Sequence, residues 1–279
     1  MMIASFEELA RAVRERRVLL FAGAGLSMSV GLPSWHELID HMKRELGLED
    51  VPHQSGWSYQ TLSEYYRLKN GSLGPLRSWM DRTWSVCSDQ VRQSEIHEII
   101  VDLDFPLVYT TNYDNNLEIA YETHGRPYVK VANTSDIVNA ERGLSQIVKF
   151  HGDFADDESL VLAETDYFRR LAFDSPLDIK FKADAMGRTL LFLGYSVSDL
   201  NIRMLLYRLW QMWQESGRER DRPPSYVFSP KQDPVQRMVL SQWGIRVLHE
   251  RAEHPSDATL KFLRRLRDAV RNTPEPELS

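Results

Sequence analysis

The sequence predicts an α/β protein built on a doubly wound, mainly parallel sheet. Short runs of uninterrupted apolar residues recur along the 279-residue chain, as is typical of parallel strands buried on both faces. Segments with the apolar spacing of helices separate these runs, and that alternation indicates a parallel sheet. The length suits one large α/β domain or two small ones. The predicted strands are residues 17–22, 107–110, 147–150, 189–193, 225–228 and 245–248.

Helix-start signals place the first two helices. The segment SFEE at residues 5–8 is a capping box, in which the Ser and Glu side chains satisfy free backbone N–H groups at a helix start. A second box, SWHE at residues 34–37, predicts a helix that ends near Gly47. The apolar spacing predicts further helices over residues 114–122, 165–173, 176–185, 200–213 and 257–271.

The character of the sequence changes between residues 51 and 105. Aromatic and polar residues mix there at helical spacing, with breaks at Asn70-Gly71 and Gly74-Pro75. We interpret this stretch as a helical insertion or subdomain within a single domain over residues 1–271. The tail, residues 272–279, is expected to be disordered.

Composition excludes several classes of protein. The net charge of −6 argues against a general nucleic-acid binder. No signal peptide is visible, and no apolar run approaches the roughly 20 residues that span a bilayer, so we expect a cytoplasmic protein without membrane contact. The lone Cys87 excludes an internal disulfide and any multi-cysteine zinc site. No metal is assigned, since these histidines lack metal-ligand spacing: His36, His41, His53 and His97.

Polar residues follow four of the predicted strands, at the point where each strand ends. In an open parallel sheet such segments lie along the carboxyl edge, where these folds bind ligands. Four clusters that carry small residues, an Asn, a His and several Asp therefore indicate one shared site. The clusters are GAGLS at 23–27, TTNYD at 110–114, HGD at 151–153 and GYSVSD at 194–199.

The glycine loop after the first strand matches no single motif. As a dinucleotide fingerprint it has two glycines, but Met28 holds the third glycine position, and no Gly-Lys-Ser/Thr follows as in a Walker phosphate loop. The segment GLSMS is close to the nucleophile elbow of esterase-type hydrolases, with Ser27 as nucleophile. Asp114 and His151 then follow in the chain order of those enzymes. A simple strand-to-helix turn remains a further alternative.

The four clusters, in this order, resemble the sirtuin superfamily, and are most similar to the sirtuin-like domains of bacterial anti-phage defence. The resemblance covers residues 17–248 and implies a Rossmann-like domain that binds NAD. It implies that the glycine loop cradles the pyrophosphate, because small residues let backbone N–H groups approach the anion. The loop residues implied to bind NAD are Gly23, Ala24, Gly25 and Ser27.

The resemblance also implies roles for single residues. Asn112 would lie beside the nicotinamide ribose and position the attacking group, and Asp114 would hold the nicotinamide carboxamide. His151 would act as a general base, a role that suits a histidine titrating near neutral pH. The remaining implied cofactor-binding residues are Gly194, Ser196 and Asp199, the last two near the adenosine ribose.

Three departures separate this chain from protein-deacylating sirtuins. It lacks their four-cysteine zinc module, the segment PSWH at residues 33–36 lacks the family's arginine, and no segment after His151 matches the one that pairs with an acyl-lysine strand. These departures favour water as the nucleophile. The resemblance then implies an NAD glycohydrolase that releases nicotinamide and ADP-ribose without a metal.

An unregulated NAD hydrolase would harm its own host, so we expect the activity of this protein to be controlled. We expect an anti-phage effector activated by assembly into a homo-oligomer or by a separate regulatory protein, such as a hexameric ATPase. Other functions stay open at this point. They are an NAD- or ADP-ribose-binding sensor module without turnover, a sirtuin-type protein deacylase, and an esterase-type hydrolase that uses Ser27.

Overall fold

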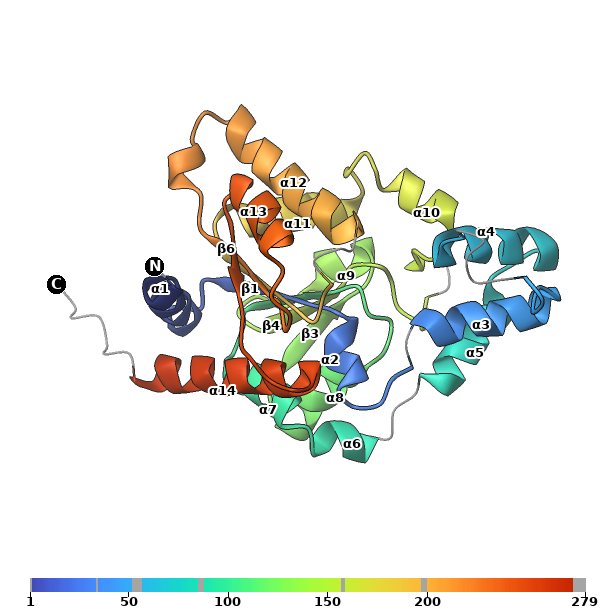
Figure 1. Cartoon of the computed structure of the whole chain (residues 1–279), viewed down its shortest axis with the longest axis horizontal. Helices are drawn as coiled ribbons and strands as arrows, with labels where there is room; N and C mark the ends of the chain where they lie inside the picture. The colour runs from blue at the N-terminus through green and yellow to red at the C-terminus, as the bar shows by residue number, and fades with distance from the viewer. Residues whose placement is uncertain are drawn as a thin grey trace.

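The computed structural model shows a seven-stranded sheet between two layers of helices (Figure 1). It describes residues 2–33, 35–51, 57–84, 88–156, 159–196 and 200–272. Asp199 and residues 273–279 of the predicted tail lie outside the described residues. Within the described chain, no helix is both long and apolar enough to cross a membrane.

All strand pairings in the sheet are parallel, and the strand order is β3-β4-β2-β1-β5-β6-β7. This confirms the predicted doubly wound, parallel α/β class. The chain runs outward from β1 on one side and then returns to its other side, so β1 marks the topological switch point. The strands are β1 (Val18–Ala22), β2 (Leu107–Thr110), β3 (Tyr128–Val131), β4 (Ser145–Lys149), β5 (Thr189–Leu193), β6 (Ser225–Phe228) and β7 (Ile245–Leu248).

The central strand shows why the sequence forms a buried parallel sheet. All five residues of β1 are buried, and successive side chains point to opposite faces. Leu20 belongs to the apolar core beneath α1 and α14, whereas Phe21 packs in a second core with Phe181 and Leu205. Both faces therefore need apolar residues, which explains the uninterrupted run VLLFA.

Two layers of helices cover the sheet. The helices α1, α7, α8 and α14 contribute to the core on one face, and α11, α12 and α13 to the core on the other. The bounds of these helices, and of the shorter helices α2, α6 and α9, are α1 (Met2–Arg14), α2 (Ala24–Met28), α6 (Ser88–Arg92), α7 (Glu95–Asp102), α8 (Asn116–Thr123), α9 (Thr134–Asn139), α11 (Pro176–Met186), α12 (Leu200–Glu215), α13 (Pro234–Gln242) and α14 (Pro255–Asn272).

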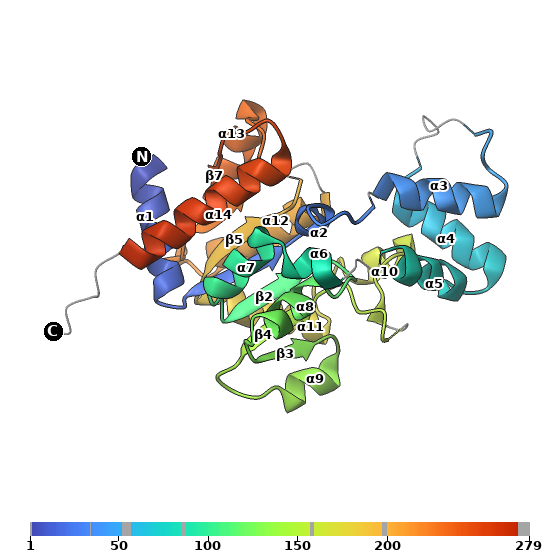
Figure 2. The same cartoon turned by 90° about the horizontal axis from the view of Figure 1, so that it is seen from below.

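Three helices form a lobe at one end of the molecule: α3 (Trp35–Leu46), α4 (Tyr59–Asn70) and α5 (Gly74–Thr83). Figure 2 shows this lobe at the end opposite the N-terminus, with α10 (Glu164–Arg169) beside it. The remaining helices of residues 51–105, α6 and α7, lie instead against the main body, where they pack on α8 and α14. The single-domain division of the chain stays a prediction.

The elements that the sequence interpretation missed are short or peripheral. The strand β3 lies at the sheet edge and is half-exposed, and its lysine interrupts the apolar run that signals a buried strand. The glycine loop was expected to precede its helix, but α2 begins at Ala24, directly after the strand. The helix predicted to end at residue 173 ends at Arg169. The helices α9 and α13 were also missed.

Candidate active site

A cavity of about 1210 Å³ opens at the carboxyl edge of the sheet, at the switch point. Its volume lies above the usual range of small-ligand pockets, roughly 300–1,000 Å³, so it can hold an extended molecule such as a dinucleotide. Loops after β1, β2, β4, β5 and β6 contribute to its walls, as do α4 and α10. The predicted site residues that line it are Ala24, Gly25, Asn112, His151, Gly194 and Ser196.

Glycines follow β1 and β5 because their two loops touch through the backbone. A Cβ on Gly23 would lie 2.6 Å from the carbonyl oxygen of Gly194, and a Cβ on Gly194 would lie 2.8 Å from that of Gly23. Gly194 also has a φ of +80°, which a side chain disfavours. Hydrogen bonds of 2.8 Å from Gly23 N to Leu193 O and from Gly25 N to Gly194 O join the loops. Gly25 and Gly194 thus form part of one wall of the cavity, with Gly23 behind them.

Tyr195 joins three strand ends at this point. Its hydroxyl donates to the carbonyl oxygen of Ala22, 3.0 Å away, and accepts a 3.3 Å hydrogen bond from the backbone N–H of Thr111. Its ring packs on Phe21 in the core. One buried side chain therefore ties the loops after β1, β2 and β5 together.

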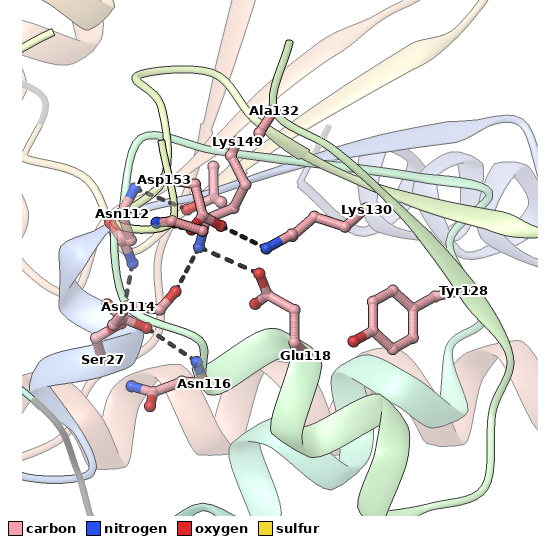
Figure 3. A network of polar contacts seen from close by, with 12 residues as sticks. Ser27, Asn112, Asp114, Asn116, Glu118, Tyr128, Lys130, Ala132, Lys149 and Asp153 are labelled. Atoms are coloured by element: carbon pink, nitrogen blue, oxygen red, sulfur yellow. Dashed lines mark hydrogen bonds and ion pairs between the residues drawn. The ribbon is translucent and has the colours of Figure 1, made fainter. Parts of the chain in front are cut away.

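Asn112 is oriented by a chain of hydrogen bonds shown in Figure 3. Ser27 Oγ donates to Asp114 Oδ2 at 2.7 Å, and Asn112 Nδ2 donates to Ser27 Oγ at 3.0 Å. An ionised carboxylate can only accept, so the single hydroxyl proton of Ser27 goes to Asp114 and its oxygen accepts from Asn112. This assignment sets the direction of the amide and leaves Asn112 Oδ1 as the acceptor that can be presented to the cavity.

Asp114 also fixes the turn that follows β2. Its Oδ1 accepts from the backbone N–H of Asn116 at 3.1 Å, at the start of α8. Asn112 N in turn donates to Thr110 Oγ1 at 3.0 Å. The segment TTNYD therefore holds its own shape through side-chain to backbone hydrogen bonds.

His151 follows β4 and lies between two aromatic rings. Its ring meets Tyr167 edge to face, with centroids 5.4 Å apart, and lies 6.0 Å from the ring of Phe150. Burial, with a smaller effect from the Arg170 guanidinium, holds the pKa of His151 well below its usual 6.5. The direction of this shift runs against the expectation that His151 titrates near neutral pH, and in its neutral form the imidazole can accept a proton.

Gly152 closes the sharp turn that contains His151, with a 3.1 Å hydrogen bond from its N–H to Lys149 O. Its φ is +92°, and a Cβ would lie 2.3 Å from the carbonyl oxygen of Ser159. Val161 N donates to His151 O at 2.9 Å. The histidine is thus held against the segment that leads into α10.

The helical lobe supplies the opposite, aromatic wall of the cavity. Trp35 stacks on Tyr59 with ring centroids 4.6 Å apart, and the hydroxyls of Tyr59 and Tyr167 lie 3.1 Å apart. These rings line the cavity together with His151. They connect the lobe to the histidine through α10.

A charged network fastens α10 to α4. Arg67 lies 2.9 Å from Asp166 Oδ1 and 2.7 Å from Glu64, and Glu64 accepts a 2.8 Å hydrogen bond from Thr165 N. The arginine holds the pKa of Glu64 below its usual value despite partial burial. We call these four residues, Glu64, Arg67, Thr165 and Asp166, the α4–α10 clamp.

Some predicted site residues lie behind the cavity wall. Ser27 is 3% exposed and, like Asp114 and Gly23, is not among the lining residues. The hydrogen-bond partners of Ser27 Oγ are a carboxylate and an amide, whereas a nucleophile elbow needs a histidine there. Among the described residues, no group of three or more His, Cys, Asp or Glu could hold a metal ion.

The sequence interpretation missed four residues that shape the site: Trp35, Tyr167, Arg170 and Tyr195. Arg170 lies over the Phe150 ring, 4.1 Å from its centroid, and donates to Phe150 O and Asp178. Tyr195 lies inside the GYS segment of the fourth cluster and Trp35 inside the capping box SWHE, but neither was assigned a role in the site. Tyr167 lies in α10, and Arg170 directly follows that helix.

Comparisons with known proteins agree with this site. A family model described as a SIR2-like domain matches residues 106–248. An NAD(+) hydrolase ThsA of Enterococcus faecium is 33% identical over 76% of this chain and 44% of its own length, and one of Bacillus cereus (strain MSX-D12) is 30% identical over 81% and 46%. Defense-associated sirtuin 2 of Bacillus subtilis is 27% identical over 75% and 21%.

The chain spans less than half the length of the curated relatives it matches. The family match nevertheless covers half of the chain, including the segments that carry Asn112, His151 and Tyr195. The predicted resemblance is confirmed. This protein belongs to the SIR2-like family.

Proposed function

We propose that this protein hydrolyses NAD to nicotinamide and ADP-ribose. The observation that carries the proposal is that Asn112 and His151, from two neighbouring strands, line one cavity beside a glycine-built wall. The names of the relatives, NAD(+) hydrolases, support the same reaction. Cleavage breaks the bond between the ribose C1′ and the nicotinamide nitrogen, and water supplies the hydroxyl that C1′ gains.

In the proposed mechanism the two residues act on that water. Asn112 Oδ1, oriented through Ser27 and Asp114, accepts a hydrogen bond from the water and holds it toward C1′. His151, whose pKa burial lowers, accepts in its neutral form the proton that the water releases. The pyrophosphate lies against the loops of Gly25 and Gly194, and nicotinamide leaves with the electron pair of the broken bond.

Purified protein incubated with NAD tests the proposal by the amounts of nicotinamide and ADP-ribose released. We expect Asn112→Ala and His151→Ala to lower the rate by about 100-fold or more, because positioned groups of this kind contribute about 10²–10⁴-fold. Both variants should keep the wild-type unfolding temperature. Full activity in both would contradict the assignment of the site.

The same assay separates the alternatives. NAD binding without nicotinamide release, by the chain alone and in the presence of candidate partners, would indicate a sensor module. Faster turnover of an acetyl-lysine peptide than of NAD alone would indicate a deacylase. Ester hydrolysis abolished by Ser27→Ala would indicate an esterase.

We further propose a cytoplasmic anti-phage effector that depletes NAD when activated. The name of the Bacillus subtilis relative, which refers to defence, supports this role. Control would come from a homo-oligomer or from a separate regulatory protein such as a hexameric ATPase. Light scattering combined with the NAD assay tests this: activity should rise with the assembled fraction or on addition of the partner.

A further inference from the structure

A lysine is completely buried beneath the proposed catalytic residues. Lys149 is the last residue of β4, two positions before His151, and its side chain is 0% exposed. Its ammonium donates to the backbone carbonyl of Asp114 and lies 3.3 Å from Glu118 Oε1, which is also buried (Figure 3). Burial raises the pKa of Glu118, and Lys149 opposes that rise.

The stability of the fold does not by itself account for this pair. Removing two charges from water costs several kcal/mol per ion, and apolar residues of similar volume often stabilise a protein as well or better. A second ion pair lies beside Lys149 and Glu118: Lys130 and Asp153 are 2.9 Å apart. The region around Lys149 is therefore already charged. A role in the site therefore offers a better explanation for Lys149.

Its contacts show what that role is. The strands β2 and β4 are joined up to a 2.7 Å hydrogen bond from Phe150 N to Thr110 O, after which the chain enters the loop that follows each strand. Lys149, at the end of β4, donates to the carbonyl of Asp114 in the loop after β2. Asp114 is the residue whose carboxylate orients Asn112 through Ser27.

We infer that Lys149, paired with Glu118, is a positioning residue that sets Asn112 relative to His151. The inference rests on the proposed NAD hydrolysis. Glu118 balances the lysine charge, and the ammonium braces the loop after β2 against β4. Neither side chain lines the cavity, so both act through Asn112.

The test compares single and double variants in the NAD assay. Lys149→Met leaves Glu118 buried and unpaired, so we expect a lower unfolding temperature and a lower kcat. Lys149→Met combined with Glu118→Leu removes both charges and should return the unfolding temperature to near the wild-type value. Its kcat should stay about 100-fold below wild type, the typical effect of misplacing a reacting group by about 1 Å, while KM for NAD changes little.

Lys43 offers a matched control. It is 5% exposed and donates to the carbonyl of Val51 at 2.6 Å, but it lies in α3 of the helical lobe. Lys43→Met should lower the unfolding temperature without changing kcat.

Two outcomes would overturn the inference: a double variant with wild-type kcat, or one that fails to fold, which would make the pair a requirement of the fold. A wild-type protein that releases no nicotinamide, either alone or with candidate partners, would instead refute the proposed function. The two failures are therefore distinguishable.

Discussion

The two walls of the cavity are built from different interactions. The sheet wall, formed by loops after β1, β2, β4 and β5, consists of backbone contacts and buried hydrogen bonds around Gly194, Asn112 and Tyr195. The lobe wall consists of stacked rings, held in place by the half-buried α4–α10 clamp. The first wall is set by the register of the strands, whereas the second depends on where the lobe lies.

The difference indicates that the two walls have different functions. Proton transfer and orientation need atoms placed to within a fraction of an ångström, and the sheet wall carries both proposed catalytic groups. The lobe wall offers apolar surface and shape, which affect substrate affinity more than the chemical step. Changes to the sheet wall should therefore lower kcat or destroy the site, while changes to the lobe wall should raise KM.

The largest effect is expected at the contact between the loops after β1 and β5. Gly194→Ala places a Cβ 2.8 Å from Gly23 O at a positive φ, so overpacking and backbone strain together should lower the free energy of unfolding by about 3 kcal/mol. NAD binding measured by calorimetry should be lost. Gly187→Ala is the control: a Cβ there meets nothing within 4 Å, and a comparable loss of stability in it would refute the explanation.

An intermediate effect is expected at the α4–α10 clamp. Arg67→Met removes the partner of Asp166 and Glu64, and loss of these charge-assisted hydrogen bonds should lower the free energy of unfolding by about 2 kcal/mol. Because Tyr167 moves with α10, KM for NAD should rise severalfold with a smaller change in kcat.

Arg92→Met provides the matched comparison, since Arg92 pairs with Asp89 at 3.4 Å on the exposed surface. Its stability should stay within about 0.5 kcal/mol of wild type. A clamp variant that lowers kcat while leaving KM unchanged would contradict the assigned role of the lobe wall.

The smallest effect concerns the pH dependence of His151, which lies where the two walls meet. Its pKa is lowered, so the imidazole stays neutral and able to accept a proton below pH 6.5. The acid limb of kcat for nicotinamide release should therefore fall below pH 6.5, and the residual rate of His151→Ala should lack that limb. An acid limb of kcat at or above pH 6.5 would mean that the titration of another group controls the rate.

The lowered pKa of His151 also affects the free energy of unfolding. Below pH 6.5 the unfolded chain binds a proton at this histidine that the folded chain does not, so the free energy of unfolding falls as the pH is lowered. Burial lowers the pKa of His97 to about 4, which adds to the same trend.

Much of the fold could be predicted because its signals are local. The predicted strands at 107–110, 189–193, 225–228 and 245–248 coincide with β2, β5, β6 and β7, since a strand buried on both faces must be apolar throughout. The strand β3 escaped prediction because an edge strand needs no such run.

The candidate site was likewise predictable only in part. The sequence determined that the segments of Gly23, Asn112, His151 and Gly194 meet at one edge, because parallel strands place their carboxyl ends together. Only the tertiary structure decided that Ser27 hydrogen-bonds Asp114, 87 residues away, and that Tyr167 lies against His151. It also decided that the pKa of His151 is lowered, because desolvation depends on what packs around a side chain and not on the residues beside it in the chain.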